Sequence, residues 1–449
     1  MTLIKLKKIP LLLCIAAFLL LLVGCYRSPL KPSAQPEGSV DATEQGLSPA
    51  NGGEQNSKAL QALIDRLSVE GGTVYIPAGE YAFAANGTQT IGAHCIKMRS
   101  NVSIVGDGAS TILKPVGDSV YGLDMFYFND YLDTGNASYL KNCRFESFVI
   151  DAIDTSCTYY TSAGKGFMFN LFENCHWKNV TVQNTDATGF GVDCPVNSTI
   201  IGCSAVACGK AATKESTGAS GFGIGFGYSE NESLLITDCK AERNRKFGFF
   251  FEHQGRFNDK KYNAIPKDLF RVTNCEAGEN LFGFGGVCTV NTVYENCVAE
   301  NSLRYGFIFK DSKNSEAIGC ESKNDREAAF AVLQTAINGD YAVSNIAYVR
   351  CTGTNSPVGV AVISENPSAF MGENSIKDCS FRQVQQYTVH TEGTMHSLLL
   401  SGNDSDSAKN AFQAQIEDFH NIGNSWNEAI VNSDTKYERK IIMEKVKIK

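Results

Sequence analysis

Short apolar runs separated by turn residues fill most of the chain, and helical periodicity is confined to one segment near the start. The best-defined runs combine a glycine with aromatic residues: Gly189-Phe190-Gly191, Gly221-Phe222-Gly223, Phe247-Gly248-Phe249, Phe282-Gly283-Phe284 and Tyr305-Gly306-Phe307. Runs of this length with turn residues between them predict strands. Their recurrence every 22 to 36 residues predicts an all-β solenoid, in which each repeat is one coil.

The alternation of side chains along each strand predicts which positions face outward. When the runs are aligned on the glycine before phenylalanine, positions one and three are apolar and are expected inside, as for Phe190 and Val192. Positions two and four then face outward. The fourth position contains Asn170, Asp193, Gly225, Glu252, Val287 and Lys310 in successive coils.

One cysteine recurs in each coil, usually after a polar residue. The nine positions are Cys143, Cys175, Cys203, Cys239, Cys275, Cys297, Cys320, Cys351 and Cys379. This spacing predicts an interior column in which cysteine acts as a small apolar side chain. Since adjacent coils lie about 4.8 Å apart, occasional disulfides remain an alternative.

The first 56 residues have the composition of a targeting segment followed by a tether. Residues 1–24 combine basic residues with an apolar run and are followed by Cys25, and this junction resembles a bacterial lipobox. The resemblance implies lipidation of Cys25, an extracytoplasmic location and attachment to the cell membrane or outer membrane. Residues 25–56 are poor in large apolar side chains and are expected to be a flexible tether.

The folded domain is expected to begin near Ser57, as the N-cap of a short helix with Leu60, Leu63, Ile64 and Leu67 on one face. The segments GGTVYIPAGEY and NVSIVGDG follow. This order resembles the opening of the right-handed parallel β-helix proteins of the pectin-lyase-like superfamily. The resemblance implies a capping helix, a β-helix over residues 57–405 and a C-terminal cap or tail over 406–449. It also implies polysaccharide hydrolase, lyase or epimerase activity without a cofactor, calcium being optional.

The outward column supplies the candidate chemistry. Asp193 and Glu252 are expected two coils apart, or about 9–10 Å between backbones, and their side chains can approach the spacing used in inverting glycoside hydrolysis. His253 is expected to assist as a proton donor. The expected substrate-binding residues are Lys310, Asp186, Gly223, Gly225 and Phe250, with the glycines hollowing the surface. The simpler alternative is that these polar residues are ordinary solvated surface.

Two enzyme patterns match this region only in part. Asn184-Thr185-Asp186 is similar to a polygalacturonase segment, but the paired aspartates, Gly-His-Gly and Arg-x-Lys of those enzymes have no counterpart. The strand ending at Asp193 resembles the Tyr-Gly-Phe-Asp-Pro-His segment of mannuronan C5-epimerases, but Cys194-Pro195 stands where those enzymes have Pro-His.

Three hypotheses follow. The leading hypothesis is a surface-anchored protein that hydrolyses a polysaccharide. The second is a lyase or C5-epimerase on a uronic-acid polymer, with Lys310 neutralising the substrate carboxylate, and the third is a glycan-binding surface protein without catalysis. The net charge of −8 argues against a nucleic-acid partner, and no cluster in the sequence specifies a metal site.

Overall fold

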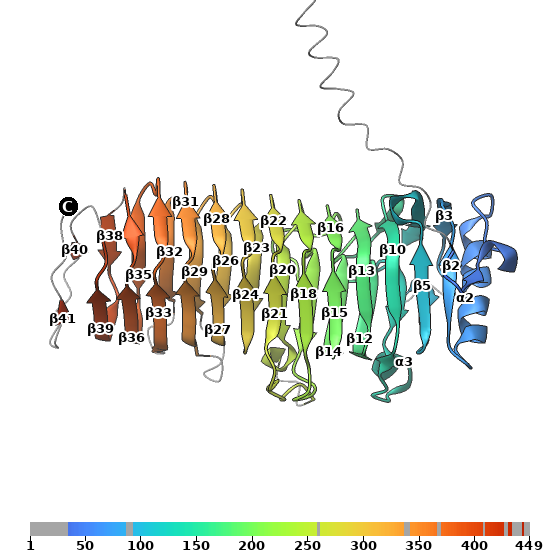
Figure 1. Cartoon of the computed structure of the whole chain (residues 1–449), viewed down its shortest axis with the longest axis horizontal. Coiled ribbons are helices and arrows are strands. Elements are labelled where there is room, and N and C mark those ends of the chain that lie inside the picture. The colour runs from blue at the N-terminus through green and yellow to red at the C-terminus, as the bar shows by residue number, and fades with distance from the viewer. Residues whose placement is uncertain are drawn as a thin grey trace, which may run out of the picture. The chain divides into compact units, whose positions relative to one another are not determined.

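The computed structural model describes residues 35–86, 93–257, 261–335, 342–365, 370–406 and 409–425, together with the backbone of 430–432 and 442–443. These residues form a right-handed parallel β-helix whose coils follow one another along its long axis (Figure 1). Each strand pairs in parallel with its counterpart in the next coil. The predicted all-β solenoid is confirmed.

The strands of each coil are divided between two long sheets. The larger sheet has 25 strands: β1 (Val40–Asp41), β2 (Gly72–Ile76), β3 (Gly79–Phe83), β5 (Val102–Gly106), β6 (Thr111–Pro115), β10 (Arg144–Asp151), β13 (His176–Gln183), β15 (Ser198–Ile201), β16 (Ser204–Val206), β18 (Leu234–Thr237), β19 (Lys240–Glu242), β21 (Phe270–Thr273), β22 (Glu276–Gly278), β24 (Thr292–Glu295), β25 (Val298–Glu300), β27 (Lys313–Ile318), β28 (Glu321–Lys323), β30 (Ser344–Val349), β31 (Thr352–Thr354), β33 (Met371–Lys377), β34 (Ser380–Arg382), β36 (Thr394–Ser401), β37 (Asp404–Ser405), β39 (Gln415–Ile422) and β41 (Ile442–Met443).

The second sheet, called the 14-strand sheet below, carries the candidate site. Its strands are β4 (His94–Lys97), β8 (Asp124–Phe128), β9 (Leu140–Lys141), β12 (Phe167–Glu173), β14 (Phe190–Val196), β17 (Phe222–Phe226), β20 (Phe247–His253), β23 (Phe282–Val287), β26 (Tyr305–Lys310), β29 (Ala328–Gln334), β32 (Val358–Ser364), β35 (Tyr387–Glu392), β38 (Lys409–Phe412) and β40 (Ile430–Asn432). A separate pair joins β7 (Gly117–Ser119) to β11 (Thr155–Cys157), and short 3-10 turns cover Thr43–Gln45, Gly108–Ser110 and Gln254–Phe257.

The interior is filled by columns of like side chains. Phe190, Phe222, Phe249, Phe284 and Phe307 stack with nearly parallel rings, and successive centroids are 4.7 to 4.8 Å apart. This spacing equals the distance between β-strands, so each ring stacks on its equivalent in the next coil. The nine repeated cysteines are also buried, and none of them forms a disulfide in the described structure. The predicted interior column is confirmed.

The residue before the repeated cysteine adopts a positive φ angle, which explains why it is often asparagine, aspartate or glycine. Asn174, Asp238, Asn274 and Asn296 all have φ between 52° and 55°, and Gly202 has φ 61° before Cys203. Asparagine, aspartate and glycine tolerate this left-handed conformation better than other residues do. The polar–Cys step therefore marks the corner of each coil.

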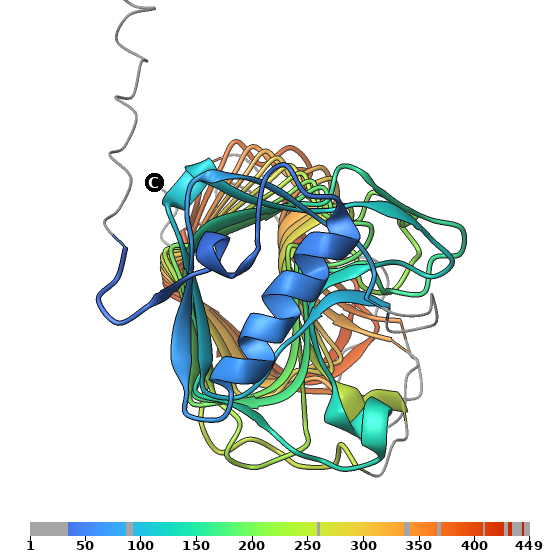
Figure 2. The ribbon, with the colours of Figure 1, turned by 90° about the vertical axis from the view of Figure 1, so that its right-hand side faces the viewer.

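A helix covers the N-terminal end of the solenoid, as the resemblance implied. Helix α2 (Gly53–Leu67) lies across the end of the coils in Figure 2, with Leu60, Leu63 and Ile64 buried. It begins four residues before the expected N-cap. Ser57 instead donates a hydrogen bond to the Ala84 carbonyl at 2.7 Å.

Both expected domain boundaries need correction. Val40–Asp41 already pairs with β2, so the ordered fold begins well before residue 57. At the other end, β38 and β39 continue the coils beyond residue 405. At the N-terminal end β1 has only two residues, and at the C-terminal end β38 and β39 lack the glycine–aromatic run and the repeated cysteine that mark the other coils. The leader and Cys25 lie outside the described residues, and no described helix is long and apolar enough to cross a membrane.

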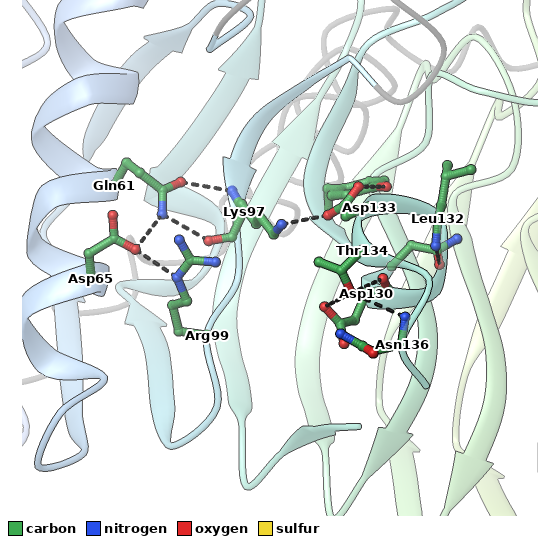
Figure 3. A network of polar contacts seen from close by, with 11 residues as sticks. Gln61, Asp65, Lys97, Arg99, Asp130, Leu132, Asp133, Thr134 and Asn136 are labelled. Carbon is green, nitrogen blue, oxygen red and sulfur yellow. Dashed lines mark hydrogen bonds and ion pairs between the residues drawn. The ribbon is translucent and has the colours of Figure 1, made fainter. Parts of the chain in front are cut away.

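A polar network connects α2 with the short helix α3 (Asp130–Thr134), as Figure 3 shows. Gln61 of α2 exchanges two hydrogen bonds with the backbone of Lys97. The Lys97 ammonium lies 2.5 Å from an Asp133 carboxylate oxygen, and the Asp133 carboxylate also accepts from Tyr127 at 2.8 Å. These contacts hold the loop that carries α3 against the ends of the first coils.

Candidate functional site

A pocket of about 310 Å³ opens on the outer face of the 14-strand sheet. Its lining comes from the coils of β14, β17 and β20 and from the loops that flank them. The lining residues are Ser162, Lys165, Thr188, Gly191, Asp193, Thr217, Gly218, Gly223, Ile224, Gly225, Phe250, Glu252 and Gln254.

The strand register brings the predicted column together. Asn170 pairs with Asp193, Gly225 pairs with Glu252, and Glu252 pairs with Val287. Gly191 pairs with Gly223, a register that places Asp193 beside Gly225, so Asp193 and Glu252 lie two coils apart with Gly225 between them. Both carboxylates line the pocket, as do the predicted residues Gly223, Gly225 and Phe250.

The Asp193 side chain leans across the intervening coil. Its Oδ1 accepts a hydrogen bond from the Gly225 backbone N–H at 2.7 Å. The carboxylate therefore lies over the Gly225 coil, which is the coil between Asp193 and Glu252. A side chain at residue 225 would displace it, because a β-carbon there would be 2.6 Å from Asp193 Oδ1. Glycine at this position is required by close packing.

Burial and two stabilising contacts shift the pKa of the Asp193 carboxyl in opposite directions. Burial raises the pKa of the Asp193 carboxyl, while the charge of Lys165 and the Gly225 N–H oppose the rise. The result is a pKa above the ordinary value for aspartate. A carboxyl that retains its proton more readily is suited to general-acid catalysis.

Lys165 is a pocket residue that the sequence analysis missed. Its side chain lies across Gly191, where a β-carbon would be 2.9 Å from Lys165 Cε. The lysine thus reaches the pocket floor only because residue 191 has no side chain. The sequence sign that could have identified it is its position at the end of an insertion, two residues before β12. Gln254 was likewise missed, and it lies beside Gly225 opposite Asp193.

Two insertions join to form one wall of the pocket. The Tyr160 hydroxyl donates to the Thr217 carbonyl at 2.6 Å, and Ser162 donates to the same carbonyl at 3.1 Å. Ser162 and Thr217 both line the pocket. Loops that interrupt the coils therefore shape the site, since the flat sheet alone would offer no wall.

His253 does not have the position that was predicted for a proton donor. Its ring is 2% exposed and packs edge-to-face on Phe226. Nδ1 accepts from the Gly255 N–H at 3.1 Å, and Nε2 is 3.0 Å from the Ala264 carbonyl, to which it donates. Burial lowers the pKa of this histidine. His253 is at the fifth position after the aligning glycine, and this position faces inward like the first and third. The ring is therefore directed away from the pocket and holds the loop after β20.

Two further predicted residues lie outside the pocket. Asp186 is 1% exposed, and its carboxylate pairs with Lys210 at 3.6 Å behind the groove. Lys310 occupies the predicted outward column, paired with Val287 and Leu333, but it lies two coils beyond Glu252 and does not line the pocket. Neither supports the predicted substrate-binding role.

The residues of the site do not form a calcium site. Calcium takes six to eight oxygen ligands, whereas the described residues include no group of three or more acidic, histidine or cysteine side chains placed to hold a metal ion. Lys165 also places a positive charge beside Asp193. No step below depends on calcium.

The fold and the site together define a parallel β-helix protein with an acidic pocket on one outer sheet face. The chain belongs to the family described as rhamnogalacturonase A/epimerase, pectate lyase-like, whose sequence model matches residues 39–307. The match includes every coil that lines the pocket and ends before Lys310. No curated protein sequence matches the chain.

Several solved structures are similar over most of the chain. The A-module of mannuronan C-5 epimerase AlgE4 from Azotobacter vinelandii is 14% identical with a TM-score of 0.57, covering 88% of this chain and 100% of that one. The catalytic unit of a GH87 α-1,3-glucanase from Streptomyces thermodiastaticus is 11% identical with a TM-score of 0.55, covering 90% and 72%. A tailspike protein mutant of E. coli bacteriophage HK620, in complex with a pentasaccharide, is 15% identical with a TM-score of 0.57, covering 90% and 75%. At these identities the likeness shows the fold alone.

Proposed function

We propose that this protein binds a polysaccharide across the 14-strand sheet and hydrolyses it in the pocket. The observation that carries the proposal is the pairing of Asp193 and Glu252 over one glycine coil, in a pocket with Phe250 beside them. Two carboxyl groups on either side of a bound glycosidic bond are the usual catalytic pair of glycoside hydrolases. The names of the similar structures, an epimerase, a glucanase and a tailspike complexed with a pentasaccharide, agree with a carbohydrate ligand.

The environment of each carboxyl suggests its role. Asp193, with its raised pKa, donates a proton to the glycosidic oxygen as the bond to the leaving sugar breaks. Glu252 acts on the other side of the sugar, either by removing a proton from the attacking water or by attacking the anomeric carbon itself. Lys165 and the Gly225 N–H stabilise the charge that Asp193 carries after it gives up its proton.

The first test is a glycan-panel assay on residues 35–449. New reducing ends indicate hydrolysis, and retention of a glycan without turnover indicates a binding protein. We expect Asp193→Asn and Glu252→Gln each to lower the rate by about 100-fold or more. The matched control is Glu373→Gln, which changes an exposed carboxylate of β33 in the other sheet. Full activity in both pocket variants would refute the assigned site.

The anomeric configuration of the first product reports the geometry of the pair. Retention of the anomeric configuration corresponds to carboxyl groups about 5–5.5 Å apart. Inversion of the configuration corresponds to carboxyl groups about 6.5–9.5 Å apart with a water molecule between them. Proton NMR of the early product distinguishes the two. The general-acid role has its own test, because Asp193→Asn should lose far less activity on a substrate whose leaving group needs no proton.

A second candidate function is supported by Lys165. A cation on the pocket floor beside two carboxylates can neutralise the carboxylate of a uronic-acid unit, which is the first requirement of a lyase or C5-epimerase. Lys165 thereby replaces Lys310, which the sequence had suggested for this role. Absorbance from unsaturated uronides, or solvent deuterium incorporated at C5, would favour this function over hydrolysis.

We also propose that the chain is lipid-anchored at Cys25 outside the cytoplasm. The support is the apolar run that ends at this cysteine in the sequence. Cys25→Ala should abolish labelling by a radioactive fatty acid and release the protein from the membrane fraction. Unchanged labelling and fractionation would contradict the anchor.

A further inference from the structure

Three loops at one edge of the 14-strand sheet bring together three tyrosines that are distant in sequence. Tyr139 follows α3, Tyr228 follows β17, and Tyr262 follows β20. The Tyr139 and Tyr228 ring centroids are 6.4 Å apart, those of Tyr228 and Tyr262 are 6.1 Å apart, and both pairs meet at 65°. All three side chains are half-buried, so each keeps part of its surface open. We call them the tyrosine row.

The tyrosine row is contiguous with the pocket. Asn170 donates a hydrogen bond to the Tyr262 hydroxyl at 3.4 Å, and Asn170 is the register partner of Asp193. At the other end, Tyr139 directly precedes β9, and β9 pairs with β12, the strand that carries Asn170. The row therefore borders the coil that carries the proposed general acid, on the side of the sheet opposite the wall made by Ser162 and Thr217.

Separate contacts hold the loops that carry the row. The buried Glu232 carboxylate accepts hydrogen bonds from the backbone N–H groups of Gly227, Tyr228 and Ser229 at 2.6, 2.8 and 3.0 Å. These bonds fix the turn that presents Tyr228. A second contact joins α3 to the loop after β20, because the Lys261 ammonium lies 3.6 Å from the centroid of the Tyr131 ring. Figure 2 shows α3 beside the short 3-10 turn of that loop.

A fixed row of partly exposed phenol rings beside a polar pocket suits a ligand that is apolar on one face and hydroxylated at its edges. A pyranose ring has that character, since its C–H groups contact aromatic surface while its hydroxyls reach the polar tips of tyrosine and asparagine. Tyrosines fixed before binding also lose little conformational entropy when the ligand arrives.

The geometry points to a second sugar-binding subsite, made by Tyr139, Tyr228 and Tyr262, that holds a sugar unit of the same polymer next to the one cleaved at Asp193. The inference rests on the proposed carbohydrate ligand and adds to it a binding position outside the pocket. The wall on the opposite side is closed by hydrogen bonds between Tyr160, Ser162 and Thr217, so the polymer extends from the pocket over the tyrosine row.

The test measures binding apart from turnover. Native affinity electrophoresis of Asp193→Asn in gels containing starch, β-glucan, α-mannan, polygalacturonate or alginate identifies a retarding glycan and its dissociation constant. Adding Tyr228→Ala to that variant should weaken binding by about five- to tenfold, whereas adding Tyr228→Phe should weaken it less than about twofold. The matched control is Tyr387→Ala, a half-buried tyrosine at the start of β35, which should leave the dissociation constant unchanged.

The outcomes separate this inference from the proposed function. If a glycan retards Asp193→Asn and the added Tyr228→Ala or Tyr262→Ala change leaves binding intact, the subsite is refuted while the pocket stands. If none of the five glycans retards Asp193→Asn, the proposed function fails with these ligands and the subsite fails with it. Circular dichroism of each variant tests whether it is folded. If Tyr228→Phe weakens binding as much as Tyr228→Ala does, the sugar is not bound through contact with the aromatic ring.

Discussion

The outer face of the 14-strand sheet differs between two neighbouring regions that share one backbone. Over β14, β17 and β20 it is hollowed by Gly191, Gly223 and Gly225 and lined by carboxylates and Lys165. Over β23 to β32 the outer face instead carries a second apolar cluster, which includes Phe282, Tyr305, Ile308, Ala331, Leu333 and Ala361. The comparison shows that strand pairing is common to both regions, and that the outward side chains together with the flanking loops decide which region forms a pocket.

Glycine illustrates the difference most directly. Gly225 keeps open the space into which Asp193 and Gln254 reach, whereas Gly285, in an equivalent outward strand region, is covered by Phe247 and Ile308. The space above both glycines is thus occupied, and the two regions differ in the chemistry of the side chains that occupy it. In the pocket region the neighbours are polar side chains that point across the gap, and in the apolar region they are large rings.

The largest expected effect concerns an aspartate that is buried beneath the apolar region, in contrast to Asp193, which is half-buried in the pocket. Asp325 is 2% exposed, accepts hydrogen bonds from Ser322 at 2.6 Å and Ser302 at 3.1 Å, and has its pKa raised by burial to about 7. The folded state thus keeps this proton up to about pH 7, while the unfolded chain releases it near pH 4. Wild-type stability should fall as the pH rises through this window, by up to about 4 kcal/mol.

We therefore expect Asp325→Asn to be more stable than the wild type at pH 8 and to differ little at pH 4, with glycan turnover unchanged. Urea unfolding followed by circular dichroism at both pH values measures the difference. The exposed Asp238→Asn serves as the control. If the free energy of unfolding changes equally with pH in the wild type and in Asp325→Asn, ionisation of the buried carboxyl does not destabilise the fold.

A side chain at residue 225 should slow catalysis in the pocket. In Gly225→Ala the new methyl group would lie 2.6 Å from Asp193 Oδ1, so the carboxylate must move. A displacement of about 1 Å in a catalytic group costs on the order of 100-fold in rate, and we expect a loss of at least tenfold. Initial rates on the glycan identified by the panel measure it. Wild-type activity would indicate that Asp193 is not held by the Gly225 coil during catalysis.

The same substitution in the apolar region should affect stability and spare activity. A β-carbon in Gly285→Ala would lie 2.8 Å from Ile308 Cγ2 and also contact the Phe247 ring. Overpacking of this kind typically costs about 1–3 kcal/mol. The midpoint of urea unfolding should fall while the catalytic rate stays within about twofold of the wild type. A loss of rate equal to that of Gly225→Ala would erase the distinction between the two regions.

The smallest effect is expected at Lys310, which shares the outward column with Glu252 but lies in the apolar region. Because it does not line the pocket, Lys310→Ala should change the rate by less than about twofold and the stability by about 0.5 kcal/mol or less. Lys165→Ala is the informative counterpart, since its ammonium lies beside Asp193. If Lys310→Ala lowers turnover more than Lys165→Ala does, the functional groove extends farther along the sheet than the pocket.

Much of this arrangement is encoded in local sequence. The glycine–aromatic runs and the cysteine spacing identified the solenoid, because each coil repeats the same inward side chains and the same left-handed corner. The period-two alternation then placed Asp193, Gly225 and Glu252 in one column, which the register confirms. These features depend on neighbours within a coil and on the equivalent residue of the next coil, so a repeat pattern suffices to predict them.

Tertiary structure decided the features that depend on how side chains lean and how insertions fold. His253 was expected in the groove, although the alternation that directs Glu252 outward already directs the next residue inward; what only the structure shows is that its ring holds the following loop. Lys165 reaches the pocket across Gly191, and the tyrosine row is assembled from three insertions. The periodic pattern of the coils predicts neither feature. The sequence by itself determined the coils and the column of carboxylates, since both follow from repetition. The walls, the missed lysine and the lean of Asp193 required contacts between segments with no common period, and only the folded chain supplies those.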